Sequence, residues 1–214
     1  MREDKIAKKG FFIVLEGLDG SGKSTQAKLL VQNLIKHGHD AVYMKEPTDG
    51  EWGQKIREIA LKGRENVTPG EELDYFIKDR EEDAEQNILP AIESGKVVVM
   101  DRYIYSNIAY QGALGIDIEL IKNKNRCFPK PDIVFFLEAS PEKGIGRIND
   151  KRTGGANVGY EKIEYLQKVD EIYHSDDFNF MLRIDAGKKV EEIQEEILEK
   201  VLVNLKVWSS TFPL

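Results

Sequence analysis

Residues 17–24 read Gly-Leu-Asp-Gly-Ser-Gly-Lys-Ser, which is the spacing Gly-x-x-x-x-Gly-Lys-Ser of a phosphate-binding loop. Gly17 and Gly22 permit backbone conformations that a Cβ would hinder, so that successive amide N–H groups can turn toward one anion. Lys23 supplies a mobile cation for the β- and γ-phosphates of a nucleotide, and the Ser24 hydroxyl can ligate Mg²⁺. The stretch therefore predicts a nucleotide phosphate site.

The sequence around this loop supplies the strand and the helix that the motif requires. Residues 11–15, Phe-Phe-Ile-Val-Leu, form a short apolar run of strand-forming residues before it. After Ser24, apolar residues recur at helical spacing up to Gly38. A glycine-rich turn that binds nothing is the alternative. It is disfavoured because all the fixed residues of the motif stand between a strand and a helix.

The composition is that of an ordinary globular protein. The chain has 214 residues, of which 41% are hydrophobic and 32% charged, which is enough for one well-buried core. No apolar stretch approaches the ~20 residues of a membrane span, and residues 1–10 lack the apolar core of a signal peptide. We therefore expect a cytoplasmic protein without a membrane partner. We expect a single domain over residues 1–214, with an N-terminal extension at 1–10 and a tail at 208–214.

The charge and the cysteine content exclude several classes of function. The net charge of −7 disfavours nucleic acid as a partner, since that would need a broad basic face. Cys127 is the single cysteine of the chain, so neither an intrachain disulfide nor a cysteine-based metal cluster can form. If the ligands are phosphates, cations must gather at one site against the overall negative sign.

Strand-like runs alternate with helical ones along the chain, which predicts a parallel sheet with crossover helices. The runs at 97–100 and 133–137 are apolar throughout, as strands buried on both faces should be. In such α/β sheets, ligands bind at the carboxyl ends of the strands. The expected strands are 11–16, 41–45, 97–101, 133–138 and 180–184, and the expected helices are 23–37, 51–62, 71–94, 103–126, 141–151, 159–175 and 188–207.

A polar segment with three glycines, residues 150–159, lies between two of these helices. It could be a mobile lid over a phosphate site, or a solvated connector. Three cations, Arg147, Lys151 and Arg152, stand in and near it. They could neutralise a phosphoryl group in transfer, or they could simply form a solvated basic helix end.

Asp101, Arg102 and Tyr103 directly follow the buried strand at 97–100. A carboxylate at the end of a core strand, beside the phosphate loop, can hold Mg²⁺ directly or through water. The guanidinium of Arg102 can clamp a phosphate with two parallel hydrogen bonds. A structural ion pair at a strand end is the alternative.

Aromatic and polar side chains share two predicted helix faces. Phe76 and Arg80 are spaced i, i+4, so that they could stack a base and bond its carbonyl edge. Tyr103, Asn107 and Tyr110 are spaced i, i+4, i+7, and the amide of Asn107 could also read a base. The alternatives are a core Phe beside a solvated Arg, and a half-buried aromatic stripe.

The second predicted strand is followed by Glu46-Pro47-Thr48-Asp49-Gly50. A carboxylate at this strand end could orient a clamping arginine or bind a metal. A simple turn is the alternative, since Pro, Asp and Gly are ordinary turn residues.

Together these motifs resemble thymidylate kinases, within the P-loop nucleoside monophosphate kinases, over about residues 11–197. The resemblance implies a three-layer P-loop NTPase fold, with a five-stranded parallel sheet flanked by helices and a short lid at about 147–159. It also implies an Mg²⁺-dependent transfer of the γ-phosphate of ATP to dTMP in dTTP synthesis, and a homodimer. The motifs that carry it, in the family's order, are Gly-Leu-Asp-Gly-Ser-Gly-Lys-Ser-Thr at 17–25, Phe-Ile-Lys-Asp-Arg at 76–80, Asp-Arg-Tyr-Ile-Tyr-Ser-Asn-Ile-Ala-Tyr-Gln-Gly at 101–112 and Pro-Lys-Pro-Asp at 129–132.

The same resemblance implies roles for individual residues. Phe76 would stack on thymine, Arg80 would bond its carbonyl edge, and Tyr110 would favour deoxyribose. The residues implied to bind ATP are Gly17, Leu18, Asp19, Gly20, Ser21, Gly22, Lys23, Ser24 and Thr25. Those implied to bind dTMP are Asp19, Glu46, Pro47, Phe76, Arg80, Arg102, Ser106, Asn107, Tyr110 and Gln111. Those implied in catalysis are Lys23, Arg102, Arg152, Arg147 and Asp19, and those implied to hold the metal are Ser24 and Asp101.

At two positions, Gly20 and Lys45, this chain lacks an arginine that some relatives carry. Some relatives place a catalytic arginine in the phosphate loop, where this chain has Gly20, so the lid is expected to supply it, Arg152 before Arg147. Many relatives carry Arg before the Glu-Pro pair, where this chain has Lys45, which keeps the charge but loses the bidentate fork. The segment 184–189 falls where the family's adenine pocket lies and offers mostly backbone groups.

Three other functions are compatible with the phosphate loop. A deoxynucleoside kinase would phosphorylate a neutral sugar hydroxyl and would need a carboxylate base beside it. A broader deoxypyrimidine monophosphate kinase would accept dUMP or dCMP. A non-catalytic nucleotide-binding regulator would be expected to lack Lys23, Asp101 or Arg102, and this chain has all three.

Overall fold

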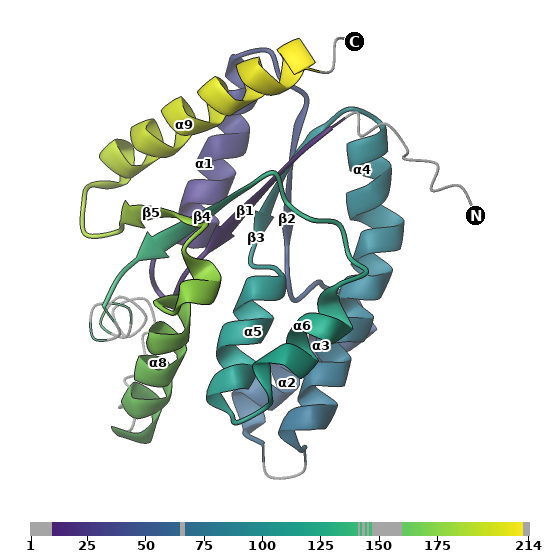
Figure 1. Ribbon diagram of the computed structural model, residues 1–214, viewed down its shortest axis with the longest axis vertical. Helices are drawn as coiled ribbons and strands as arrows, with labels where there is room; N and C mark the ends of the chain where they lie inside the picture. The colour runs from purple at the N-terminus through teal and green to yellow at the C-terminus, as the bar shows by residue number, and fades with distance from the viewer. Residues whose placement is uncertain are drawn as a thin grey trace.

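The computed structural model describes residues 10–64, 67–140, 142, 144, 146 and 160–211. Five strands form one sheet in the order β2-β3-β1-β4-β5, and every adjacent pair is parallel (Figure 1). The predicted five-stranded parallel α/β architecture is therefore confirmed. The strands are β1 (Phe11–Glu16), β2 (Ala41–Lys45), β3 (Val97–Asp101), β4 (Ile133–Glu138) and β5 (Leu182–Asp185).

Helices connect the strands and cover both faces of the sheet (Figure 1). Helices α1 and α9 lie against one face, and α3, α4, α5, α6 and α8 lie on the opposite side. The helical elements are α1 (Lys23–Lys36), α2 (Glu51–Lys62), α3 (Pro69–Asp83), the π-helical turn η1 (Ala84–Ile88), α4 (Leu89–Glu93), α5 (Ile104–Ala113), α6 (Ile118–Asn125), α8 (Tyr160–Tyr173), the 3₁₀ turn η2 (Asp176–Phe178) and α9 (Val190–Thr211).

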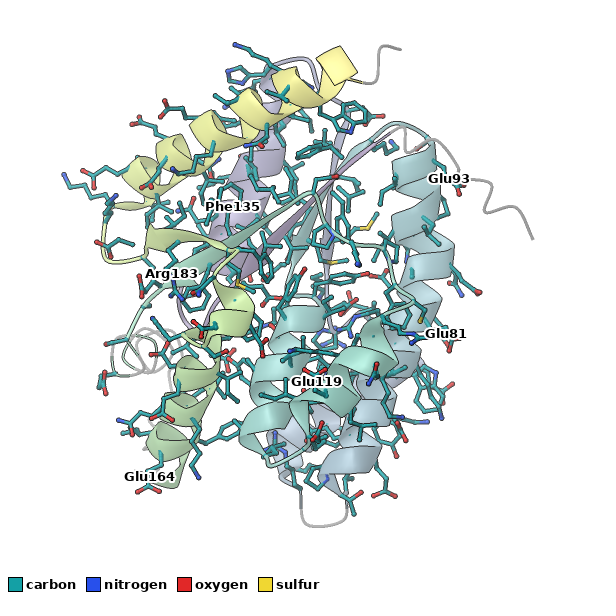
Figure 2. The ribbon with its side chains drawn as sticks, viewed as in Figure 1. Glu81, Glu93, Glu119, Phe135, Glu164 and Arg183 are labelled. Atoms are coloured by element: carbon teal, nitrogen blue, oxygen red, sulfur yellow. The ribbon has the colours of Figure 1, made fainter. Side chains whose placement is uncertain are left out.

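The helices are amphipathic around these two core layers. Phe135 of β4 is fully buried between the sheet and the α1/α9 layer, while Glu81, Glu93, Glu119 and Glu164 point outward from their helices (Figure 2). Strands β1 and β3 are buried along their whole length, because neighbours cover both faces and both edges. The two central strands therefore give a rigid base for the loops that follow them.

Two predicted helices are divided in the structure. The range 71–94 is helical throughout, but a π-helical turn at Ala84–Ile88 interrupts it. Pro90 has no N–H to give to the carbonyl four residues earlier, and a wider turn relieves its ring clash. The range 103–126 is two helices, because Gly115 takes a positive φ of 90° and Asp117 caps a new helix through the Leu120 N–H.

The predicted last strand is displaced by a short turn. We expected 180–184, and β5 spans Leu182–Asp185 because the 3₁₀ turn at Asp176–Phe178 holds Met181 outside the sheet through its N–H bond to Phe178. No helix among the described residues is long and apolar enough to cross a membrane. The expected lid at 147–159 with Arg147 and Arg152, residues 1–9 of the N-terminal extension, and the end of the tail at 212–214 lie outside the described residues.

Candidate functional site

The phosphate loop follows β1 at the centre of the sheet and leads directly into α1. Gly17, Gly20 and Gly22 all have positive φ, of 144°, 81° and 101°, a region that favours glycine. Gly22 is the N-cap residue of α1, so the loop places its amides at the positive end of the helix dipole. A Cβ on Gly20 would lie 2.2 Å from the backbone oxygen of Gly144. The loop therefore has no room for a side chain at position 20.

Lys23 lies inside the loop rather than in solvent. Its Nζ donates to the backbone oxygens of Gly17 at 3.0 Å and Leu18 at 2.7 Å, with Ser21 Oγ at 3.4 Å. Burial and the nearby Arg102 guanidinium lower the Lys23 pKa to about 8. This ammonium is thus held in place by carbonyls that an anionic ligand can replace.

The first turn of α1 meets the end of β3 at an oxygen pair. Ser24 Oγ donates to Asp101 Oδ2 at 2.5 Å, and the Tyr43 hydroxyl donates to the same oxygen at 3.2 Å. A hydroxyl beside a carboxylate next to a phosphate loop is a donor set suited to Mg²⁺, which takes few protein ligands and keeps its waters. Larger groups of three or more His, Cys, Asp or Glu suited to a metal do not occur within the described ranges.

Arg102 reaches from the end of β3 toward the phosphate loop. It adopts φ 70°, which a non-glycine residue rarely does, and its Nη2 donates to Asp19 Oδ1 at 2.6 Å. Its Nη1 donates to Ser106 Oγ at 2.8 Å, and its guanidinium stacks on the Tyr110 ring. The Tyr110 hydroxyl accepts from the Asp19 N–H at 3.2 Å. The structure therefore brings together four of the predicted site residues.

Glu16 is a buried carboxylate behind this cluster that the sequence analysis did not identify. It accepts hydrogen bonds from the Tyr103 and Ser106 N–H groups at 2.9 and 3.1 Å, and from the Ser106 and Tyr173 hydroxyls at 2.5 and 2.9 Å. Burial raises its pKa. Its signal was a charged residue ending the otherwise apolar strand 11–16, which is weak by itself.

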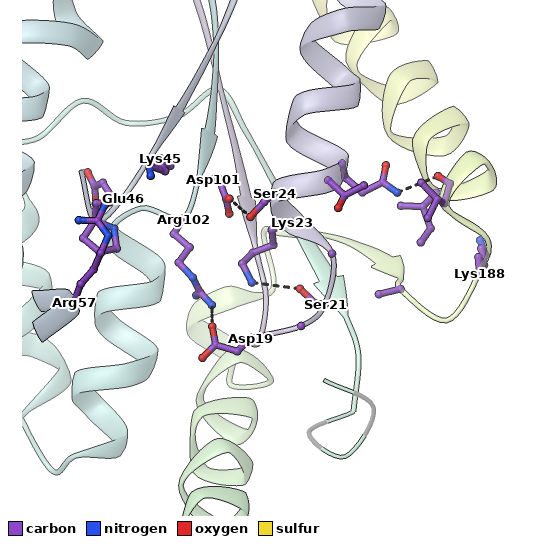
Figure 3. Close-up of a pocket in the computed structure, with 18 residues that line it drawn as sticks. Asp19, Ser21, Lys23, Ser24, Lys45, Glu46, Arg57, Asp101, Arg102 and Lys188 are labelled. Carbon is purple, nitrogen blue, oxygen red and sulfur yellow. Dashed lines mark hydrogen bonds and ion pairs between the residues drawn. The ribbon is translucent and has the colours of Figure 1, made fainter. Parts of the chain in front are cut away.

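A cavity of about 700 Å³ runs along the carboxyl edge of the sheet (Figure 3). Lys23, Ser24, Asp101 and Arg102 lie in its middle, Lys45, Glu46 and Arg57 lie toward one end, and Lys188 lies toward the other (Figure 3). The register explains the gathering, because Asp101 pairs with Leu15 of β1 and with Lys45 of β2. The residues lining it are Asp19, Gly20, Ser21, Gly22, Lys23, Ser24, Thr25, Gln26, Lys45, Glu46, Pro47, Arg57, Asp101, Arg102, Ala186, Lys188, Val190 and Ile193.

Arg57 of α2 is a second residue that the sequence analysis did not identify. It donates from Nη1 to the Thr48 oxygen at 2.5 Å and from Nη2 to the Pro47 oxygen at 2.9 Å and Asp49 Oδ1 at 2.6 Å. The peptide bond before Pro47 is cis. Lys45 donates to the same Asp49 oxygen at 3.0 Å. Two cations therefore lie at this end of the cavity, where the sequence had indicated one.

Arg80 is buried. The alternative in which Arg80 is a solvated side chain beside a core phenylalanine is therefore wrong. Its side chain is 1% exposed, and its Nε and Nη2 donate to the Glu46 carboxylate at 2.9 and 2.5 Å. Its Nη1 donates to Asn107 Oδ1 at 3.1 Å and to Asn125 Oδ1. Burial raises the Glu46 pKa to about 7 against the attraction of Arg80.

The predicted aromatic stripe is divided between the core and the site. Tyr103 is fully buried against Phe12, and its hydroxyl donates to the Pro129 oxygen at 3.1 Å. Tyr110 faces Asp19 instead, as described above. Phe76 is partly exposed and belongs to neither core cluster among the described side chains. Tyr103 is therefore structural, and Phe76 keeps a face for another contact.

Comparison with known proteins gives one consistent result. The family model described as "Thymidylate kinase" matches residues 15–197. A protein named "Probable thymidylate kinase" from Archaeoglobus fulgidus is 42% identical over 197 residues, which cover 91% of this chain and 97% of the relative. A protein named "Thymidylate kinase" from Desulfotalea psychrophila is 42% identical, over 92% of this chain and 97% of the relative. A protein of the same name from Brachyspira hyodysenteriae is 44% identical, over 90% of this chain and 94% of the relative.

Proposed function

The chain belongs to the thymidylate kinase family, and from this premise we propose that it transfers the γ-phosphate of ATP to dTMP, giving ADP and dTDP. The observation that carries the assignment is the cavity with Lys23 and Arg102 at its middle, Lys45 and Arg57 toward one end and Lys188 toward the other (Figure 3). Two nucleotides that enter from opposite ends bring their phosphates together at these two cations. Phosphoryl transfer needs this alignment and charge neutralisation more than covalent help.

The ATP end is formed by the phosphate loop and the segment before α9. The amides of residues 17–25 bind the phosphates, and Lys23 exchanges its loop carbonyls for phosphate oxygens. Lys188 and Val190 line the cavity beyond the loop, next to Gln26, whose Nε2 donates to the Val190 oxygen at 3.0 Å. This end is the place for adenosine.

Ser24 and Asp101 would hold Mg²⁺, the latter directly or through water, and the ion would supply positive charge that offsets the charge of the phosphates. Ser24 Oγ and Asp101 Oδ2 are 2.5 Å apart, so the two oxygens stand together at one point of the site.

We place the dTMP end at the loop after β2, where Glu46, Pro47 and Arg57 line the cavity; helices α3 and α5 lie behind this loop, and their residues do not line the cavity itself. Arg102 holds the acceptor phosphate with its fork, and Arg57 reaches the same phosphate from α2. Phe76 stacks on the base, while Arg80, Asn107 and Gln111 face its edge. Pro47, Glu46 and Ser106 support these groups, and Asp19 and Tyr110 lie against the sugar.

The lid supplies the remaining cation. Gly20 leaves no space in the loop for an arginine, because of its approach to Gly144. Arg152, or else Arg147, closes over the transferred group and keeps water away from it. The acceptor oxygen is already anionic, so that a general base is not needed. The active molecule is a single-domain protomer in a homodimer.

A coupled assay of ADP release with Mg-ATP tests the function. It compares dTMP with thymidine, dUMP, dCMP and UMP as acceptors. We expect turnover that strongly favours dTMP. Equal turnover of several monophosphates would contradict the base assignment, turnover of thymidine alone would indicate a deoxynucleoside kinase, and ATP binding without any turnover would indicate a non-catalytic regulator.

A further inference from the structure

A buried polar network lies where α3, α5 and α6 meet, beside the proposed dTMP end of the cavity. Its members are Arg80, Glu46, Asn107, Gln111 and Asn125, which are at most 6% exposed. Burying so many polar groups is costly unless each finds its partner, so such networks fix side chains in one arrangement. Asn125 is the member that lies in none of the motifs and outside the lining of the cavity in Figure 3; it lines a second pocket, of about 420 Å³, between α5 and α6.

The directions of the hydrogen bonds in this network follow from Arg80, which can only donate. Asn107 and Asn125 must therefore both turn their amide oxygens toward its Nη1. The Nδ2 of Asn125 then donates to Asn107 Oδ1 at 3.4 Å and to the Ile121 backbone oxygen at 2.9 Å. Each amide of the pair is thereby prevented from turning over.

The fixed direction passes on to Gln111. Because Asn107 turns its oxygen toward Arg80 and Asn125, its Nδ2 points the other way and donates to Gln111 Oε1 at 2.7 Å. Gln111 is left with its amide NH₂ as the group to offer. Arg80 spends four of its five N–H groups on Glu46, Asn107 and Asn125 within the described part of the chain, which leaves one on Nη2.

We propose that Asn125 is a positioning residue that determines base selectivity, because it fixes this chain of amides so that the acceptor site presents N–H donors. The inference rests on the proposed function, in which Arg80 and Gln111 face the base. A 4-oxo pyrimidine such as thymine or uracil offers a carbonyl oxygen to these donors. A 4-amino pyrimidine such as cytosine sets its own N–H groups against them, and buried donors without acceptors bind poorly.

The test measures kcat/KM for dTMP and dCMP in the wild-type chain, in Asn125→Ala and in Asn123→Ala. Where dCMP turnover is too slow, its inhibition constant against dTMP replaces kcat/KM. Asn123 is an exposed residue of the same helix and serves as the matched control. We expect Asn125→Ala to raise the KM for dTMP and to lower the dTMP-to-dCMP preference ~10-fold or more. The KM of Asn125→Ala for ATP should stay within about twofold of wild type. The kcat/KM values of Asn123→Ala for dTMP and for dCMP should also stay within about twofold of wild type.

If Asn125→Ala does not fold, a second variant, Asn125→Asp, tests the same proposal. Asn125→Asp retains an oxygen for Arg80 but has no N–H for Asn107, so its preference for dTMP should also fall. A folded, active variant of either kind with the wild-type preference would overturn the proposal. Equal losses for dTMP, dCMP and ATP would also overturn it, since they would indicate only a structural role. Failure of the proposed function itself would appear separately, as absence of dTMP turnover in the wild-type chain.

Discussion

Arg57 shows how one side chain can complete a site from outside every motif. It is positioned by the backbone oxygens of the loop it contacts, Pro47 and Thr48, and these bonds hold its guanidinium toward the cavity. Preorganised donors of this kind lose little entropy when an anion binds.

We predict that Arg57→Ala raises the KM for dTMP by about 10- to 100-fold, as expected for loss of a charge-assisted contact. Steady-state kinetics with each substrate varied in turn measures this effect. The KM for ATP should be unchanged, because Arg57 lies at the other end of the cavity. Lys62→Ala, an exposed change on the same helix, is the control. Arg57→Ala with a normal KM for dTMP would place the arginine outside the acceptor site.

Asp83 carries a second residue-scale prediction. It is 5% exposed, its Oδ2 has no hydrogen-bond partner among the described residues, and its Oδ1 accepts from Asn87 at 2.8 Å. Burial raises its pKa to about 6, Asp79 adds to the increase, and Arg80 opposes it. The folded state therefore holds a proton that the unfolded chain releases near pH 4, so this group's contribution to stability is lost as the pH rises from about 4 to about 6.

We predict that Asp83→Asn raises the free energy of unfolding by about 1–3 kcal/mol at pH 8. Near pH 3 the gain should vanish, because the carboxyl is then largely protonated in both states. Urea unfolding at the two pH values measures it, with Glu85→Gln, an exposed change nearby, as the control. A loss of stability at pH 8 would mean that an ionised Asp83 is needed beside Arg80.

The residues of the phosphate loop could be predicted from sequence, because each occupies a fixed position in a contiguous motif. The same holds for Asp101 and Arg102, which directly follow a recognisable buried strand. Glu16, Arg57 and Asn125 could not be predicted, since their roles depend on contacts with segments distant along the chain. Local periodicity carries no information about such contacts.

At the scale of elements, α5 is the helix that assembles the acceptor side of the site. Arg102, two residues before the helix, lines the cavity and bonds Ser106 and Tyr110 of the helix, while Asn107 belongs to the buried network. The N-terminus of this helix is held by Glu16, which accepts the N–H groups of Tyr103 and Ser106 in place of a capping residue. The position of the helix thus depends on one carboxylate from β1.

We predict that Glu16→Gln lowers the free energy of unfolding by about 1–3 kcal/mol, because its amide NH₂ would face donors that now meet an oxygen. It should also lower kcat, since Arg102 is held through Ser106. Urea denaturation together with steady-state kinetics measures both effects. Glu138→Gln, at the partly exposed end of β4, is the control and should change neither by much. A variant as stable and as active as wild type would show that α5 does not depend on this cap.

The number of strands and their parallel direction could be predicted, because strand-like runs alternate with helical ones and the inner strands are contiguous apolar runs. The order of the strands across the sheet was not predicted. Helix interruptions were harder. Gly115 and Asp117 carry a readable signal for a helix end and a new cap, but their apolar surroundings continue the helical period. For the π turn at Ala84–Ile88, Pro90 is the sequence signal that we recognise, and a proline there is equally compatible with a simple kink.

At the scale of the whole molecule, positive side chains gather at the cavity although the chain as a whole is acidic. The chain carries a net charge of −7, yet cations gather along the cavity from five separate elements or loops. They are Lys23, Lys45, Arg57, Arg102 and Lys188. The positive field is therefore confined to the site, which favours small polyanions over long nucleic acids.

This arrangement leads to a prediction about both ends at once. A dinucleotide that joins adenosine and thymidine through a 5′,5′-polyphosphate bridge should occupy the cavity from end to end. Linking the two halves makes the second binding event intramolecular, so we expect a Kd at least ~100-fold below that of ATP or dTMP alone. At a ligand concentration 100 times its Kd, the stabilisation of the folded state is about 2.7 kcal/mol. Calorimetric titration measures the Kd, and thermal denaturation measures the stabilisation.

The diadenosine compound with the same bridge is the control, and it should bind more weakly because Phe76 and Arg80 then meet a purine. Equal binding of the two dinucleotides would mean that only the phosphates and one adenosine are recognised, and that thymidine does not enter the far end of the cavity.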